Sequence, residues 1–528
     1  MRTTMATALL GTLLASCGGK ADTGAQHDGT TAATQYDEAD TDTDSDSDTD
    51  ADADSDTDAD ADSDTDADAD ADTDADADAD TDADTDADTG EDTGLEPLCD
   101  DSTPVTLYIS PDDSNSMASP VLCREVVTNG GSLPDVRTHE FFNYYDFDYP
   151  PADPDRLAVT AAMRQDNGTD YTLQIGVSSE EVHDATRAEL NVVLSLDTSC
   201  SMSGAPLQLA KASGVAMASK LRAGDVISIV DWSTTPVVTL EEHQVTGADD
   251  PVVVTAIDGI DASGGTNLSA GLSKAYELAA NHYDPAKINR VVLISDGGAN
   301  MGTTDEAIIA EHAGAYNEDG IYMVGVGVGT ASSYNDTLMN QVTDVGRGAA
   351  VFIGDTSEAW SIFADQFVNV FDVAARDVQV RLDLPPGFEI LRTSAEEYSA
   401  DPTEIEPQNI APNDAMVFYQ QLTTCAPEDV TPDSTFEVIV TFKHPISFME
   451  HQVTRQYSFE EAMAGDADLL AKGDAVYAYA SALQAERTGT VKEAAAALAL
   501  AMDRLTVAEA LRPKDADLDE IRDVLSRL

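Results

Sequence analysis

Positive charge is scarce in this 528-residue chain. Only 27 Lys and Arg stand against 100 Asp and Glu, which gives a formal net charge of −73 at pH 7. A chain this acidic has no basic patch for the phosphates of DNA or RNA, so nucleic acid is excluded as a partner. The five cysteines form no Cys-x-x-Cys pair and the eight histidines form no cluster, which argues against zinc and thioredoxin-like redox sites.

Long apolar runs are also missing, since no stretch approaches the roughly 18–20 apolar residues that span a bilayer. The first 17 residues have instead the parts of a targeting segment: Arg2, an apolar stretch from Ala6 to Ala15, and Leu-Ala-Ser-Cys ending at Cys17. This ending resembles the bacterial lipoprotein cleavage box. The resemblance implies that Cys17 carries several acyl chains, which anchor a protein stably where one chain does not. The resemblance also implies the outer membrane of the cell envelope and not the inner one, because Gly18 and not Asp follows the cysteine. A plain signal peptide is the alternative.

Residues 18–95 consist largely of Asp, Ala, Thr and Ser, and every even position from Asp40 to Asp88 is Asp. Alternation normally predicts a strand, but here there is no apolar face to bury, so charge repulsion favours a disordered tether. Such a tether spans on the order of 100 Å when extended. A weak Ca²⁺-binding tract is the alternative. Residues 96–528 still carry a net charge of −44, which fits adaptation to salt water or cationic partners.

A candidate metal loop follows a buried strand in the stretch NVVLSLDTSCSMSG. The apolar run Val192–Leu196 predicts the strand, and a helical pattern begins near Pro206. Between them stand Asp197, Ser199 and Ser201, at the carboxyl end of the strand, where open α/β sheets bind ligands. One carboxylate and two hydroxyls are hard oxygen donors, which suit Mg²⁺ or Mn²⁺ better than zinc or copper.

Two further stretches supply partners for this loop. SGGTNLSAGL places Thr266 before a new helix, and VVLISDGGAN places Asp296 at the end of an apolar strand. These residues resemble the metal-ion-dependent adhesion site of von Willebrand factor type A domains. The resemblance implies five ligands for Mg²⁺, Mn²⁺ or Ca²⁺, with Cys200 at a position where the family usually has Gly. An ordinary N-capped loop is the alternative. The implied ligands are Asp197, Ser199, Ser201, Thr266 and Asp296.

The stretch around this site predicts an α/β fold. Apolar strands alternate with helical patterns, as in a mostly parallel sheet covered by helices on both faces, and Val237–Leu240 predicts a short antiparallel edge strand. The other expected strands are Val192–Leu196, Val226–Val230, Val291–Ser295, Ile321–Val328 and Val351–Ile353. The expected helices are Pro206–Leu221, Asn267–His282, Thr304–Glu318, Asp336–Val345 and Ser357–Phe371.

The flanking regions predict a β unit and a helical tail. Val105–Ser110 and the pair LAVTAAM and YTLQIGVSS precede the α/β domain, and VQVRLDLP, MVFYQQL and FEVIVTFKHP follow it, so the two sets could share sheets. The aromatic cluster in EFFNYYDFDYPP is expected in a core. That stretch and SPDDSNSMASP resemble the region before the type A domain in bacterial YfbK-type lipoproteins. In SPDDSNSMASP, Asp112, Ser114 and Ser116 repeat Asp-x-Ser-x-Ser without an evident Thr or Asp partner.

The expected organisation has six parts. They are a signal segment at 1–17, a tether at 18–95, an N-terminal β-rich region at 96–187, the type A domain at 188–373, a β unit at 374–455 and a helical region at 456–528. With Cys17 lipidated, four cysteines remain in an oxidising compartment. Cys99 and Cys123 share the N-terminal region and are expected to pair, which leaves Cys200 with Cys425.

These features predict a binding module of the cell envelope. Two carboxylates do not saturate a divalent cation, so an Asp or Glu of an unidentified partner protein could complete the shell. The membrane is contacted through the lipid anchor, and no small-molecule substrate is expected. A scaffold with a purely structural metal is the first alternative. A metal-dependent enzyme is the least favoured, because no nucleophile motif and no Walker-type phosphate loop occurs.

Overall fold

The computed structural model describes residues 100, 102–111, 116–298 and 320–528. Several predicted features lie outside these residues. They are the predicted lipidation site Cys17, the predicted tether, Cys99, the 112–115 part of the second Asp-x-Ser-x-Ser loop and the predicted helix Thr304–Glu318. No helix in the described ranges is long and apolar enough to cross a membrane.

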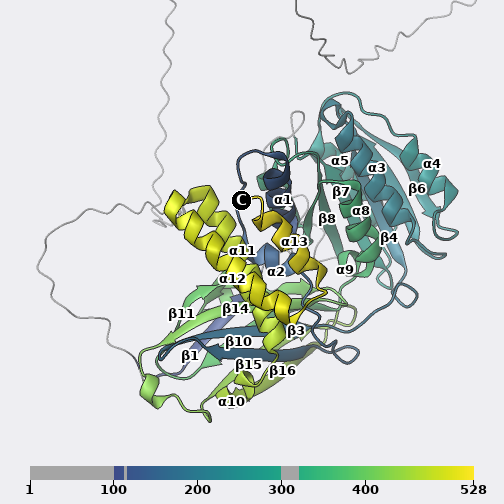
Figure 1. Cartoon of the computed structure of the whole chain (residues 1–528). Coiled ribbons are helices and arrows are strands. Elements are labelled where there is room, and N and C mark those ends of the chain that lie inside the picture. The colour runs from purple at the N-terminus through teal and green to yellow at the C-terminus, as the bar shows by residue number, and fades with distance from the viewer. Residues whose placement is uncertain (1–99, 101, 112–115, 299–319) are drawn as a thin grey trace, which may run out of the picture. The chain divides into compact units, whose positions relative to one another are not determined.

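The central domain is built on the predicted sheet, with strand order β6-β5-β4-β7-β8-β9 (Figure 1). Five strands are parallel, and β6 runs antiparallel to β5 at the edge. β4, β7 and β8 are buried along their whole length, as expected for a sheet covered on both faces. The strands are β4 Leu190–Asp197, β5 Val226–Trp232, β6 Pro236–Gln244, β7 Ile288–Ser295, β8 Ile321–Val328 and β9 Ala350–Ile353.

Alternate side chains of β4 reach the two helical layers. Val192 and Leu194 pack with α3, α4 and α8, whereas Val193 packs with α5 and α7. Two details differ from the prediction. Helix α4 was not predicted, because its β-branched residues favour an extended strand. The helix forms with Asp250 as its N-terminal cap. The last helix is interrupted by a π turn at Ser361–Asp365. The helices are α3 Ala205–Ala218, α4 Pro251–Asp258, α5 Leu268–Asn281, α7 Asp336–Val345, α8 Thr356–Trp360 and α9 Phe367–Phe371.

The β unit consists of two sheets whose inner faces share one core. One has the order β12-β1-β10-β15-β16, with β13 beside β10, and the other has the order β11-β14-β3-β2. Both combine strands that precede the α/β domain with strands that follow it, so the expected sharing is confirmed. The strands are β1 Val105–Ser110, β2 Ala158–Gln165, β3 Asp170–Ser178, β10 Ala375–Leu384, β11 Phe388–Thr393, β12 Glu397–Ser399, β13 Gln408–Ile410, β14 Ala415–Thr424, β15 Thr435–Lys443 and β16 Glu450–Ser458.

The C-terminal region is helical, as predicted, and packs on two helices from the N-terminal region. The aromatic cluster lies in this core, where the rings of Phe141 and Tyr479 meet edge to face with centroids 5.3 Å apart. A capping box of Thr490 and Glu493 starts α12. The helices are α1 Ala118–Asn129, α2 Thr138–Tyr144, α10 Phe459–Met463, α11 Ala467–Thr488, α12 Val491–Leu511 and α13 Ala516–Leu525.

The cysteines correct one expectation. Cys123 is a free thiol, so the predicted Cys99–Cys123 bond is wrong. Its place on α1 explains this, because the side chain is fully buried in the core that α2 and α11 form. Cys200 and Cys425 are both disulfide-bonded, and their pairing with each other stays a prediction.

Candidate metal site

Two neighbouring strands bring the candidate carboxylates to one edge of the sheet. β4 and β7 are parallel, and their register sets Leu196 opposite Ile294. Asp197 ends β4, and Asp296 follows the last residue of β7. The register therefore places both aspartates at the carboxyl ends of adjacent strands, where the sequence predicted them.

Both carboxylate oxygens of Asp197 accept hydrogen bonds from the surrounding loops. The Ser199 amide donates to Oδ1 at 2.8 Å, and the Ser295 hydroxyl donates to Oδ2 at 2.7 Å. The Ser199 and Ser201 hydroxyl oxygens are hydrogen-bonded to each other at 3.0 Å. Asp197 and Ser199 are buried, whereas Ser201 is exposed. The carboxylate is thus fixed in orientation, and the hydroxyl pair leads from it to the surface.

The loop that carries Thr266 is held against the loop after β4 by backbone hydrogen bonds. The Ser263 amide donates to the Thr198 carbonyl at 2.6 Å, and the Cys200 amide donates to the Gly264 carbonyl at 3.2 Å. Gly264 has φ +78°, and a Cβ there would lie 2.8 Å from the Thr234 hydroxyl oxygen, so the position requires glycine. These contacts bring the 263–267 loop, with the buried Thr266, beside the serine loop.

The loop after β7 fixes Asp296. Its Oδ1 accepts from the Gly298 amide at 3.2 Å, and its carbonyl accepts from the Asn335 amide at 3.2 Å. Gly297 has φ +77°, and a Cβ there would lie 2.9 Å from Asn335. The Asp296 side chain is only 7% exposed. A tight turn of two glycines therefore presents a buried carboxylate at the edge that Asp197 occupies.

The two aspartates make this end of the sheet negatively charged. Burial raises the pKa of Asp197 to about 6, the hydrogen bonds from Ser199 and Ser295 oppose the rise, and the charge of Asp296 adds to it. No cationic side chain is among these main influences on the pKa. Burial therefore disfavours the charged form of the Asp197 carboxylate, and a cation bound beside it would relieve this cost.

The donor set fits a hard divalent cation. Two carboxylates and three hydroxyls, each with oxygen lone pairs to offer, are the ligands that Mg²⁺, Mn²⁺ and Ca²⁺ prefer. The described residues contain no group of three or more His, Cys, Asp or Glu that could hold a metal, but the candidate shell has only two such residues. The five predicted residues thus lie on three loops at one sheet edge, with four of them buried.

Sequence reasoning missed the residue that orients Asp197. Ser295 donates to the carboxylate and also accepts from the Gly297 amide at 3.0 Å. A single hydroxyl at the end of the apolar run VVLIS was the available signal. The second Asp-x-Ser-x-Ser loop is described only at Ser116, whose hydroxyl accepts from the Ala350 amide at the edge of β9.

Comparison with known proteins places the site inside a known domain type. Residues 192–299, which contain all five candidates, match the family model of the von Willebrand factor type A domain. The uncharacterized protein YfbK of Escherichia coli is 30% identical over 274 residues, which are 49% of this chain and 47% of that protein. The uncharacterized protein sll0103 of Synechocystis is 24% identical over 214 residues, covering 40% of this chain and 49% of that protein.

The chain therefore spans about half the length of the curated relatives it matches. Among solved structures, a von Willebrand factor type A protein from Catenulispora acidiphila covers 67% of this chain and 87% of its own, with 14% identity and a TM-score of 0.44. The family match and the observed strand order together give a type A-like sheet with its helices, joined to a β-rich region and a C-terminal helical region.

Proposed function

We propose that this protein is a lipid-anchored envelope protein whose type A-like domain holds a divalent cation and through it binds an acidic group of a partner protein. One observation carries the proposal. Asp197 is buried and held by two hydrogen bonds, Asp296 acts on it from the next strand, and no cation is among the main influences on it. In this proposal the site binds a partner and catalyses no reaction.

Each of the five residues has a place in this proposal. Asp197 and Asp296 would supply the negative charge, while Ser199, Ser201 and Thr266 would supply neutral oxygens. A divalent cation bound there neutralises both carboxylates and attracts a further anionic ligand. Ser295 would keep Asp197 in position, as residues behind metal ligands commonly do.

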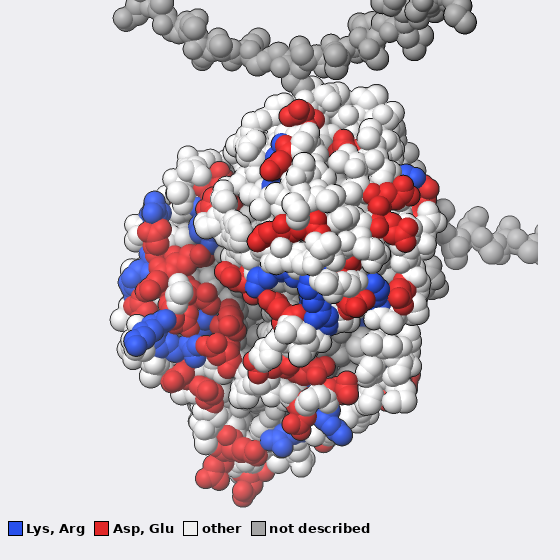
Figure 2. Space-filling view, turned by 90° about the vertical axis from the view of Figure 1, so that its right-hand side faces the viewer, with Lys and Arg blue, Asp and Glu red and all other residues white. Residues whose placement is uncertain are grey.

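The partner's acidic group would approach from the side of Ser201, the exposed member of the set. The rest of the molecule constrains the partner. Figure 2 shows Asp and Glu in several clusters over one face, with Lys and Arg among them. Because residues 96–528 carry a net charge of −44, a generally anionic partner is repelled. The contact we propose is therefore local, with one Asp or Glu reaching the site.

A capture experiment from envelope extract tests this proposal. Full chain on a support is incubated with extract in Mg²⁺ and in EDTA, and Asp296→Ala is run beside it. We expect a partner retained in Mg²⁺ and lost in both other cases. Asp261→Ala is the control, because Asp261 is exposed three residues before the glycine of the Thr266 loop. Retention in EDTA, or by Asp296→Ala at the wild-type level, would contradict metal-dependent binding.

The anchor is tested separately. If the Cys17 lipid holds the protein in the outer membrane, Cys17→Ser should move it from the detergent phase to the aqueous phase or leave it unprocessed. Unchanged partitioning would count against the lipid.

The tether is expected to give no helix or sheet signal in circular dichroism, with or without Ca²⁺, and an ordered signal induced by Ca²⁺ would favour the ion-binding alternative.

A further inference from the structure

Arginines cluster at the other end of the parallel strands, where β7 begins. Arg290 lies near the start of β7 and is paired in register with Tyr322 of β8. Six residues separate Arg290 from Asp296, so at about 3.3 Å per residue the two edges are about 20 Å apart. Arg376 comes from β10 of the β unit. The guanidinium carbons of Arg290 and Arg376 lie 4.9 and 5.1 Å from the centre of the Tyr322 ring.

Neither guanidinium has a carboxylate within ion-pair distance among the described residues, although Asp372 acts on Arg290 from farther away. Arg290 and Arg376 are 5% and 8% exposed, and no ion pair joins either of them to an acidic side chain within 4.0 Å. Arg290 donates only one long hydrogen bond, from Nη1 to the Asn289 carbonyl at 3.4 Å. The Arg376 Nε and the Tyr322 hydroxyl are buried without any hydrogen-bond partner.

Such an arrangement is costly. Burial of a charge is unfavourable unless it is paired and hydrogen-bonded, and stacking on an aromatic ring offsets only about 0.5–2 kcal/mol. Elsewhere in this chain the buried cations are paired. Arg187 and Asp225, both fully buried, are 2.6 Å apart, and Lys472 lies 2.8 Å from Asp515. This chain has 100 acidic residues. Two buried arginines without an acidic residue at ion-pair distance therefore need another explanation.

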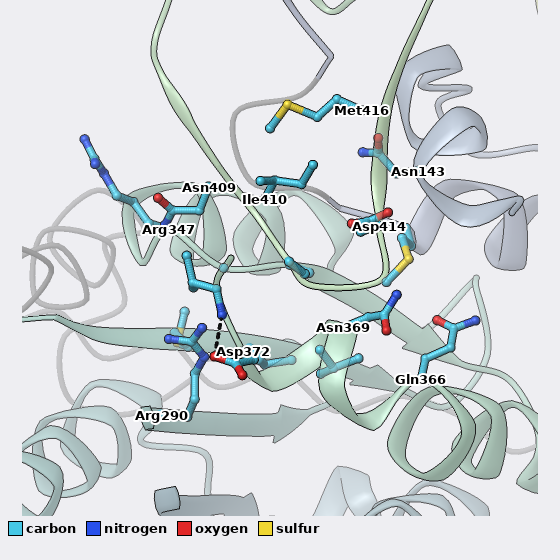
Figure 3. Close-up of a pocket in the computed structure, with 18 of the residues that line it drawn as sticks. Asn143, Arg290, Arg347, Gln366, Asn369, Asp372, Asn409, Ile410, Asp414 and Met416 are labelled. Carbon is cyan, nitrogen blue, oxygen red and sulfur yellow. Dashed lines mark hydrogen bonds between the residues drawn. The ribbon is translucent and has the colours of Figure 1, made fainter. Parts of the chain in front are cut away.

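A cavity lies at these groups, between the α/β domain and the β unit. It has a volume of about 140 Å³, and its lining includes Arg290, Tyr322, Arg376, Asp372, Ile446 and Phe448. A second cavity of about 90 Å³ shares Arg290 and Asp372 with it. Figure 3 shows these two side chains close together in that second cavity, with Arg347 directed away from them.

The cavity keeps a net positive charge even when the carboxylate of Asp372 is counted. Its Oδ1 accepts from the Val373 amide at 2.9 Å, and burial raises its pKa. Lys287 also lines the cavity, but its ammonium is 3.1 Å from Glu189 and donates to the Gly224 carbonyl. Two unpaired guanidiniums against one carboxylate leave a charge of at least +1, which suits a singly charged anion.

The backbone around Arg376 is shaped to hold it there. The pairing of β10 shifts register at this residue, and Asp377 has φ +50°, so a bulge aims the side chain. In the β15–β16 turn, Phe448 has φ +56°, which is rare for a bulky residue. This conformation sets its ring centre 4.5 Å from the Arg376 guanidinium, while Phe448 and Ile446 remain 53% and 63% exposed. Unusual backbone near buried polar groups is a common feature of binding sites.

We propose that this cavity binds a small organic carboxylate with a short apolar chain. The carboxylate would face the two guanidiniums, and the chain would lie on Phe448 and Ile446. The volume of about 140 Å³ is enough for a carboxylate and a short chain of carbon atoms. Asp372 disfavours a doubly charged anion. The ligand is bound and not converted, and the site is independent of the proposed metal site.

The test uses the purified full chain and butyrate as the probe. Saturation-transfer NMR should show binding of butyrate at millimolar concentration. Arg376→Gln should weaken it by about tenfold or more, because hydrogen bonds to charged groups are among the stronger ones. Arg381→Gln is the matched control: it lies on the same strand but pairs with Asp383 outside the cavity. Phe448 lies at an exposed turn. Phe448→Ala should weaken the binding of butyrate a few-fold and the binding of acetate only slightly, because acetate has almost no apolar chain.

Circular dichroism of each variant shows whether it is folded, and Phe448→Ala keeps the proposal testable if Arg376→Gln does not fold. Absence of saturation transfer with the wild type would overturn the proposal, and so would equal binding by wild type and folded Arg376→Gln. Displacement of butyrate by sulfate at lower concentration than by acetate would overturn the assignment to an organic monoanion.

Discussion

The two ends of strand β7 hold buried groups of opposite charge, and the described residues do not fully compensate the charge at either end. At the carboxyl end, Asp296 and Asp197 share an edge without a cation among the main influences on Asp197. At the amino end, Arg290 and Arg376 flank Tyr322 without a carboxylate within ion-pair distance. Because the folded region is otherwise rich in close ion pairs, the comparison points to ligands of opposite charge at the two ends.

The two ends also differ in how they are built. The aspartates and hydroxyls lie on loops that follow strands of one domain, and short backbone hydrogen bonds tie these loops together. The arginines stand on strands of two domains, and a bulge in β10 brings Arg376 to the cavity. One end is thus assembled locally, and the other exists only when the β unit is docked.

The largest expected effect contrasts a paired buried arginine with an unpaired one. Arg187→Met should destabilise the protein by about 3–5 kcal/mol, because it leaves Asp225 buried without its cation. Arg376→Met should change the free energy of unfolding by about 1 kcal/mol or less, since only stacking contacts are lost. Denaturant titration of both variants measures this. Similar losses would show that Arg376 has a structural partner and would break the comparison.

A half-buried carboxyl group in the second cavity has its charge removed by a proton and not by a cation. Burial raises the pKa of Asp414 to about 6 from 3.8 (Figure 3). The folded state then binds more protons than the unfolded state between these values, so stability is full below pH 3.8 and falls as pH rises through 6. Allowing for partial exposure, we expect a loss of about 2 kcal/mol. Asp414→Asn should flatten this part of the stability–pH curve, and an unchanged slope would contradict the assignment.

A smaller effect sharpens the description of the metal end. Ser295→Ala removes the hydroxyl that donates to Asp197 Oδ2, so Mn²⁺ affinity should fall by about tenfold, the lower range for residues behind a metal ligand. Ser195→Ala is the matched control, because that buried hydroxyl accepts from the Trp232 indole and does not touch Asp197. Calorimetric titration compares the two. Equal affinity of both variants would show that Ser295 does not position the ligand.

Most of the sheet could be predicted from the sequence, because strands buried on both faces are continuous apolar runs. Ile321–Val328 has the predicted bounds and is buried throughout. In the β unit, the half-buried strand Val105–Ser110 also has the predicted bounds. Exposed or very short strands gave a weaker signal, so β16, which alternates polar residues on an open face, and the three-residue β12 and β13 were missed. Helix α4 was missed because its cap outweighs the strand preference of its valines.

The two ends of β7 differ in predictability for the same reason that they differ in construction. Three local motifs could predict Asp197, Thr266 and Asp296 together, because parallel strands end at one edge. No local pattern could pair Arg290 with Arg376, since packing between domains brings them together. The Cys99–Cys123 pairing failed likewise, because the place of Cys123 is set by α11, which lies far along the chain.

Titration of Mn²⁺ into four forms of the full chain tests the central claim most directly. We expect the wild type and Arg376→Gln to bind at millimolar concentration or better with equal affinity. Thr266→Ala should bind more weakly, because water can replace a neutral donor, and Asp197→Ala should lose about 100-fold or more, because half of the formal negative charge is gone. Failure of the wild type to bind, or binding by Asp197→Ala at the wild-type level, would contradict the metal site and the function built on it.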